Sequence, residues 1–119
     1  MDYPLPDLLD RVSIARLKVE RIGEDTCKRE YDALLKEIPA YGFDQADEYV
    51  DKLYEVNGRI WDMESDIRSG KEEELGLEEV GRRAIQIRKM NKLRVGIKNE
   101  IAEKSESGFV DIKMNHGSE

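Results

Sequence analysis

The sequence has little of the residue types that form disulfides, metal centres and membrane spans. Its 119 residues include one cysteine and one histidine, Cys27 and His116, so an intrachain disulfide is impossible and a zinc site would lack ligands. A lone cysteine also favours a reducing compartment, and no apolar run reaches membrane-spanning length. We therefore expect a cytoplasmic protein with no metal, no cofactor and no membrane association.

Basic residues are fewer than acidic ones, and aromatic residues are scarce. The chain has 20 Lys and Arg against 27 Asp and Glu, a net charge of −7, and only 7% aromatic residues. Nucleic-acid binding requires a basic surface that neutralises phosphates, so nucleic acid is excluded as an expected partner. The 39% of charged residues, together with heptad-like spacing, is typical of a helical bundle with solvated outer faces.

The segment from Gln45 to Ser69 shows the clearest pattern. Its apolar residues recur at steps of three and four, which predicts one long helix with a buried stripe, capped by Asp44. Asn57 and Glu64 fall inside that stripe. A buried carboxylate is costly unless it is paired, so the neighbouring helices should supply a basic partner for Glu64. The stripe consists of Ala46, Tyr49, Leu53, Val56, Ile60, Met63 and Ile67.

The other segments predict an all-α antiparallel bundle of three to four helices in a single domain, residues 1–119. An apolar stripe over residues 8–38 changes phase at Gly23, which indicates two helices or one bent helix. Ile14 and Leu17 give the first helix a second apolar face, typical of a central helix or a subunit contact. After an acidic linker at 71–76, the last helix should span 77–104 and complete the bundle, 1–104. The tail, 105–119, should be extended, because residues 109–114 alternate like a short strand.

Several polar residues of these helices should meet inside the bundle. A hairpin turning near residues 70–76 places Asn57 level with Asn91 and Glu64 level with Arg83, and the turn near Tyr41 places Lys18 level with Glu64. This set has a structural interpretation, a hydrogen-bonded network that fixes helix register, and we favour it because structural ion pairs are common in bundles. It also has a functional one, a pocket for a small anionic or sugar-like ligand. The candidate residues, none with an assigned catalytic role, are Asp10, Lys18, Asn57, Trp61, Glu64, Asn91, Arg94 and Lys98.

Three segments of the chain, 7–18, 57–68 and 91–101, resemble a bacterial family of helical proteins of unknown function. They contain Asp-Leu-Leu-Asp-Arg-Val, Asn-Gly-Arg-Ile-Trp-Asp-Met-Glu and Asn-Lys-Leu-Arg-Val-Gly-Ile-Lys. Members of that family are small proteins, or domains found with glycosyltransferases and polysaccharide-synthesis proteins. The resemblance implies a helical fold, a polar set that acts as one unit, and an accessory role beside enzymes of glycan or nucleotide-sugar metabolism.

These observations lead to two hypotheses of function. The first is a non-enzymatic interaction or accessory module. The alternative is a small-molecule-binding protein, or a small helical enzyme, acting on an anionic or sugar-like metabolite through the polar set. Three apolar surfaces without an assigned partner predict a symmetric homodimer, and a different protein partner stays open as well. These surfaces are Ile14 with Leu17, the patch of Met90, Leu93 and Ile97, and the segment 109–114.

Overall fold

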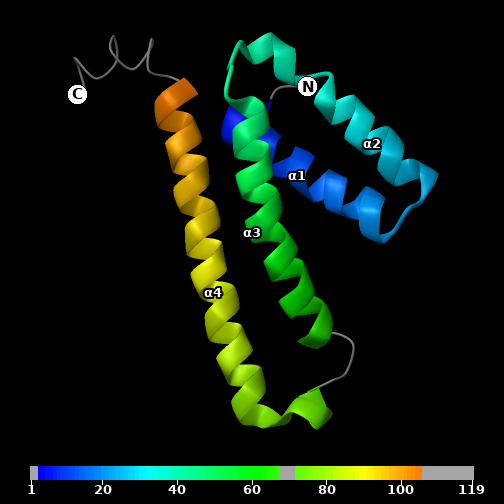
Figure 1. Cartoon of the computed structure of the whole chain (residues 1–119), viewed down its shortest axis with the longest axis vertical. Coiled ribbons are helices and arrows are strands. Elements are labelled where there is room, and N and C mark those ends of the chain that lie inside the picture. Colours follow the sequence, from blue (N-terminus) through cyan, green and yellow to red (C-terminus); the bar gives the residue numbers. More distant parts are fainter. Residues whose placement is uncertain (1–2, 68–71, 106–119) are drawn as a thin grey trace.

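The computed structural model describes residues 3–67 and 72–105, and every regular element in these ranges is a helix (Figure 1). This confirms the predicted all-α bundle. The expected strand at 109–114 lies outside the described residues. The elements are α1 (Leu5–Arg21), α2 (Asp25–Leu35), a short 3-10 helix η1 (Ile38–Tyr41), α3 (Ala46–Asp66) and α4 (Glu72–Ser105).

The chain reverses direction at Gly23, between α1 and α2. Gly23 has φ +78°, a left-handed conformation that costs free energy for any residue with a Cβ. The backbone N–H groups of Ile22 and Gly23 both donate to the carbonyl of Lys18, which satisfies an otherwise orphaned acceptor at the helix end. The predicted interruption at Gly23 is therefore a break between two helices and not a bend in one.

The core forms where α1 crosses the first half of α3. Leu8, Leu9 and Val12 of α1 pack against Tyr49 and Leu53 of α3, and all five side chains are fully buried. These residues come from neighbouring turns of each helix, so their side chains share one face. The last turns of α4 close the same cluster with Ile101, which is also fully buried.

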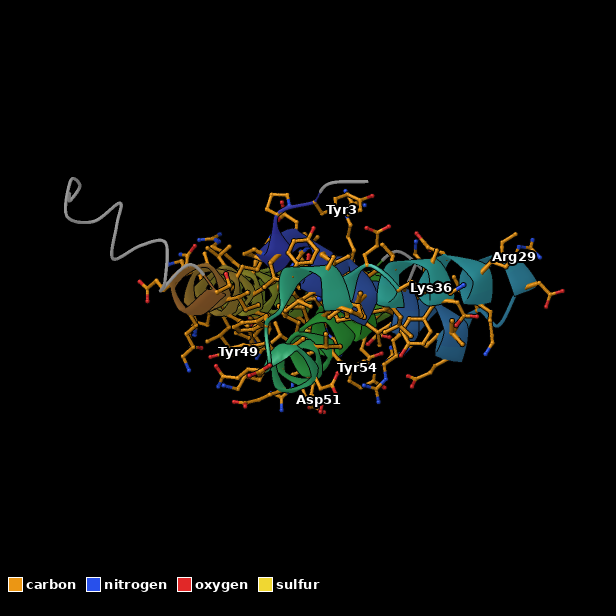
Figure 2. All side chains as sticks on the ribbon, turned by 90° about the horizontal axis from the view of Figure 1, so that it is seen from above. Tyr3, Arg29, Lys36, Tyr49, Asp51 and Tyr54 are labelled. Atoms are coloured by element: carbon orange, nitrogen blue, oxygen red, sulfur yellow. The ribbon has the colours of Figure 1, made fainter. Side chains whose placement is uncertain are left out.

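Helix α1 is the central helix of the domain. It packs against α2, α3 and α4, and in the view of Figure 2 α2 and α4 lie on opposite sides of it, with Arg29 of α2 far from α4. Its second apolar face is largely covered, because Leu17 is fully buried and Ile14 half-buried. The central position is thus confirmed, and the expectation that Ile14 and Leu17 stay available for a subunit contact is wrong.

Helices α3 and α4 lie side by side, and one end of this pair extends beyond α1 and α2 (Figure 1). We call this projecting part, residues 59–67 of α3 and 77–93 of α4, the arm. Near its tip, Arg83 Nη1 donates to Asp66 Oδ2 at 2.6 Å. Helix α1 reaches only the inner turns of the arm, where Arg21 pairs with Asp62, so part of the apolar surface of the arm has no third helix to cover it.

Two helix starts differ from expectation. Helix α3 begins at Ala46 with Gln45 at the cap position and no side-chain cap bond, so Asp44 is not its cap. Helix α4 begins already at Glu72 and is interrupted at Gly76, whose φ of +81° and ψ of 157° are not helical. Residues 72–75, expected in a linker, therefore form a helical turn, and the main part of α4 follows Gly76 as predicted.

The same substitution at two glycines should shift stability in opposite directions. Gly23→Ala should lower the free energy of unfolding by about 1 kcal/mol, because alanine is strained at a positive φ. Gly96→Ala lies inside α4, where an added Cβ meets nothing within 4 Å, and should raise it by up to about 1 kcal/mol through helix propensity. Urea unfolding measures both values, and shifts of the same sign would contradict the described backbone.

Candidate functional site

A buried carboxylate lies where the first half of α1 packs against both α3 and α4. Asp10 follows Leu8 and Leu9 on α1 and is only 4% exposed. Arg94 of α4 holds it with two hydrogen bonds, Nε donating to Oδ1 at 3.0 Å and Nη2 donating to Oδ2. A bidentate hydrogen bond of this kind matches the planar guanidinium to the carboxylate, and it fixes the position and orientation of the two side chains.

Asn57 brings α3 into the same network. Its Nδ2 donates to Asp10 Oδ1 and to Ser13 Oγ, both at 2.9 Å, and Ser13 Oγ donates to the Asp10 carbonyl at 2.7 Å. Hydrogen bonding to Asp10 raises the pKa of Arg94 above its ordinary value, against desolvation, which lowers it. The network therefore joins three helices around a guanidinium that stays charged.

A second ion pair lies one turn further along the same two helices. Lys98 Nζ of α4 lies 2.9 Å from Asp7 Oδ1 of α1, and these side chains are 29% and 45% exposed. Because Asp7 and Asp10 are three residues apart on α1, and Arg94 and Lys98 four apart on α4, each pair shares one helix face. We call the contact between these two faces the seam. Because this outer pair is solvated, it contributes far less than the buried one.

The structure does not place Glu64 in a buried ion pair. Glu64 is half-buried and forms no ion pair with another described residue. Arg83, one predicted partner, pairs instead with Asp66, and Lys18, the other, lies 3.4 Å from Glu30 of α2. A hollow between α1, α3 and α4 lies over this position of the α3 stripe, so no basic side chain among the described residues packs directly against Glu64.

A small polar hollow adjoins the network, between α1, α3 and α4. Its volume is about 190 Å³, and Ile14, Leu17 and Ile60 form its apolar part. Asp10 and Lys98 belong to the ion pairs beside it, and Lys18 does not join the group. Five of the candidate residues line the hollow, namely Asn57, Trp61, Glu64, Asn91 and Arg94. The structure thus brings most of the predicted set together.

A second, larger hollow lies on the other side of the arm. It measures about 480 Å³ and is formed only by α3 and α4. We call it the arm groove. Met63 was part of the predicted stripe of residues 46–67 and Met90 of a predicted apolar patch, whereas the polar residues of this hollow were not among the predicted site residues. The arm groove is lined by Arg59, Asp62 and Met63 of α3 and by Gln86, Lys89 and Met90 of α4.

Residues 3–67 and 72–105 contain no clustered metal ligands and no membrane-spanning helix. No group of three or more His, Cys, Asp or Glu side chains in these ranges is arranged to hold a metal ion. None of the helices described here is both long enough and apolar enough to cross a membrane.

Comparison of the chain with protein-family models, with curated proteins and with solved structures gave no match. The resemblance to the glycosyltransferase-associated helical family therefore stays a prediction that rests on the three quoted segments.

Removal of Asp10 and removal of Asp7 should lower the free energy of unfolding by unequal amounts. Asp10→Ala leaves the guanidinium of Arg94 and the amide of Asn57 without their partner and should cost about 3 kcal/mol of stability. Asp7→Ala, the matched control on the same face of α1, should cost about 1 kcal/mol or less, because its pair with Lys98 is solvated. Urea unfolding at neutral pH compares the two variants, and equal losses would contradict the buried network.

Truncation of Glu64 should leave stability almost unchanged. Glu64→Ala removes a half-exposed carboxylate that makes no ion pair with a described residue, so the free energy of unfolding should change by less than about 0.5 kcal/mol. Thermal melting measures this directly. A loss of several kcal/mol would restore the buried-pair interpretation of Glu64.

Proposed function

We propose that this protein is a non-enzymatic helical interaction module that docks through the arm, and that the occupant of the arm groove is a second copy of the chain. The observation that carries the proposal is the exposure of large apolar side chains on α4. Leu93 is 53% exposed and Ile85 49%, and both lie on the long helix α4. Exposed apolar surface of this kind is typical of protein contacts.

The arm groove has the composition of a helix-binding surface. Half-buried Met63 and Met90 supply adaptable apolar side chains, one from each helix. Leu93 continues the face of Met90 one turn further along α4, because residues three apart are neighbours on a helix. A helix placed in the arm groove would cover all three side chains and complete the layer that the arm lacks.

Charge supports a second copy as the occupant. Arg59 and Lys89 line the arm groove and form no ion pair with any residue in the described ranges, whereas Asp62 is paired with Arg21 and its side chain is still 64% exposed. A symmetric contact uses the same patch on both partners, so the patch must carry both signs of charge. A twofold arrangement can place Asp62 of each copy opposite Arg59 or Lys89 of the other.

A non-enzymatic role is favoured by the state of the polar network. Two nitrogens of Arg94, the most strongly basic group beside the small hollow, are already held by Asp10. This arrangement suits a structural role better than the capture of an anionic substrate. The resemblance of segments 7–18, 57–68 and 91–101 supports an accessory role beside enzymes of glycan or nucleotide-sugar metabolism, and the scarcity of cysteine supports a cytoplasmic location.

Two substitutions on opposite faces of α4 test the docking surface. Leu93 and Val95 are equally exposed, at 53% and 54%, and two residues along a helix turn the side chain through about 200°. Leu93→Lys should convert a dimer into a monomer, because it places a charge in the apolar contact. Val95→Lys, the matched control, should stay dimeric. Light scattering coupled to gel filtration, at about 100 μM protein, measures the mass of each variant.

The unmodified chain must first form a dimer in that experiment. A monomer at this concentration would contradict a second copy as the occupant. A dimer that survives Leu93→Lys, or that Val95→Lys disrupts to the same extent, would show that the contact lies elsewhere on the molecule.

A further inference from the structure

The small hollow between α1, α3 and α4 gathers polar groups that have no partner within the described residues. Asn57 uses both donors of Nδ2 on Asp10 and Ser13, which leaves its Oδ1 acceptor. The half-buried amide of Asn91 and the indole N–H of Trp61 also lack hydrogen bonds to other described residues. Among the described residues none of these atoms is buried without a partner, so water reaches them, and a ligand in the hollow would take the place of that water.

The charges around the hollow disfavour an anion. Glu64 contributes a carboxylate with no ion pair in the described ranges, and it lies close enough to Arg94 to raise the pKa of that guanidinium. Asp10 already neutralises Arg94 through two hydrogen bonds. Arg21, whose guanidinium lies 5.8 Å from the centre of the Trp61 ring, is itself paired with Asp62. Three carboxylates therefore oppose two guanidinium groups, so the local charge is negative and an anionic ligand would be repelled.

The remaining groups match a ligand that both donates and accepts hydrogen bonds. Glu64 and Asn57 Oδ1 accept, the Trp61 indole donates, and the Asn91 amide does both. Hydroxyl groups have the same dual capacity. The apolar part of the hollow, formed by Ile14, Leu17 and Ile60, and the indole ring suit the C–H faces of a small ring.

We propose that this hollow binds a small, uncharged, hydroxyl-rich molecule of about monosaccharide size, with Asn57, Glu64 and Asn91 as its hydrogen-bonding residues and Trp61 at its side. The volume of about 190 Å³ is below the range of about 300–1,000 Å³ that is typical for drug-sized ligands, which sets the size. The site is independent of the arm groove, because the two hollows share no residue.

Trp61 is the only tryptophan of the chain, so its indole signal reports on this hollow alone. The full-length protein, labelled with ¹⁵N, is titrated with glucose, galactose and N-acetylglucosamine, and separately with glucose 6-phosphate, up to about 50 mM, since weak small ligands have millimolar Kd values. At least one uncharged sugar should shift the Trp61 indole cross-peak saturably. Glucose 6-phosphate should bind about tenfold more weakly than glucose or not at all, because Glu64 repels it.

Two asparagines of α4 provide matched variants. Asn91→Ala should raise the Kd of the bound sugar about tenfold through the loss of hydrogen bonds, whereas Asn99→Ala, at an exposed position two turns away, should leave the Kd unchanged. Glu64→Gln should still bind the sugar, and the Kd values of glucose and glucose 6-phosphate should differ less than in the unmodified protein.

Several results would overturn the proposal. The first is the absence of a saturable shift of the Trp61 cross-peak with any of the three uncharged sugars. The second is a lower Kd for glucose 6-phosphate than for glucose. The third is an equal loss of sugar affinity in the Asn91→Ala and Asn99→Ala variants. Each of them is distinct from a failure of the proposed dimer, which is measured by mass.

Discussion

The arrangement of the helices depends on one buried interaction, the bidentate hydrogen bond between Asp10 and Arg94. Asp10 is buried beside Leu9 and Ser13 of α1, and Arg94 belongs to the last helix, 84 residues later in the chain. A buried carboxylate without a cation would be strongly destabilising. The pair therefore requires that α4 return to α1 at one register, and Asn57 sets the position of α3 in the same way.

This constraint also explains where the two hollows form. Arg94 ties α4 to α1 near the first half of α3, and the helices separate beyond that point. The small hollow opens directly beside the network, where polar side chains of three helices line it. The arm groove opens on the opposite side, where only α3 and α4 remain. A further ion pair joins Arg16 of α1 to Asp51 of α3 at 3.2 Å, and Figure 2 shows Asp51 and Tyr54 of α3 near each other.

Most of the fold could be predicted from the spacing of apolar residues. The three-and-four pattern of residues 46–67 and the interruption at Gly23 determine where helices form, because a helix must bury one face and glycine adopts the left-handed turn most easily. Helix starts were less predictable, since Gln45 and Glu72 make no distinctive capping signal. The central position of α1 followed from its second apolar face, which contains Leu17.

The sequence predicted which residues lie at the site, but not which of them pair with one another. Asn57, Trp61, Asn91 and Arg94 do lie together, because a helical hairpin of this length sets their levels along the axis. The partner of each charge could not be predicted, since a stripe on one helix does not show how far a crossing helix covers it. Glu64 therefore looked buried although a hollow lies over it, and Asp10, a member of the predicted set, had no predicted partner although three helices enclose it.

The most direct test of this account is a double-mutant cycle on Asp10 and Arg94. Asp10→Asn, Arg94→Met and the double variant are unfolded with urea, and the coupling energy is the part of the stability loss that is not additive. A buried, hydrogen-bonded ion pair predicts a coupling of about 2 kcal/mol or more. A coupling below about 0.5 kcal/mol, the range of solvated surface pairs, would contradict the role of this interaction as the one that holds α1, α3 and α4 in register.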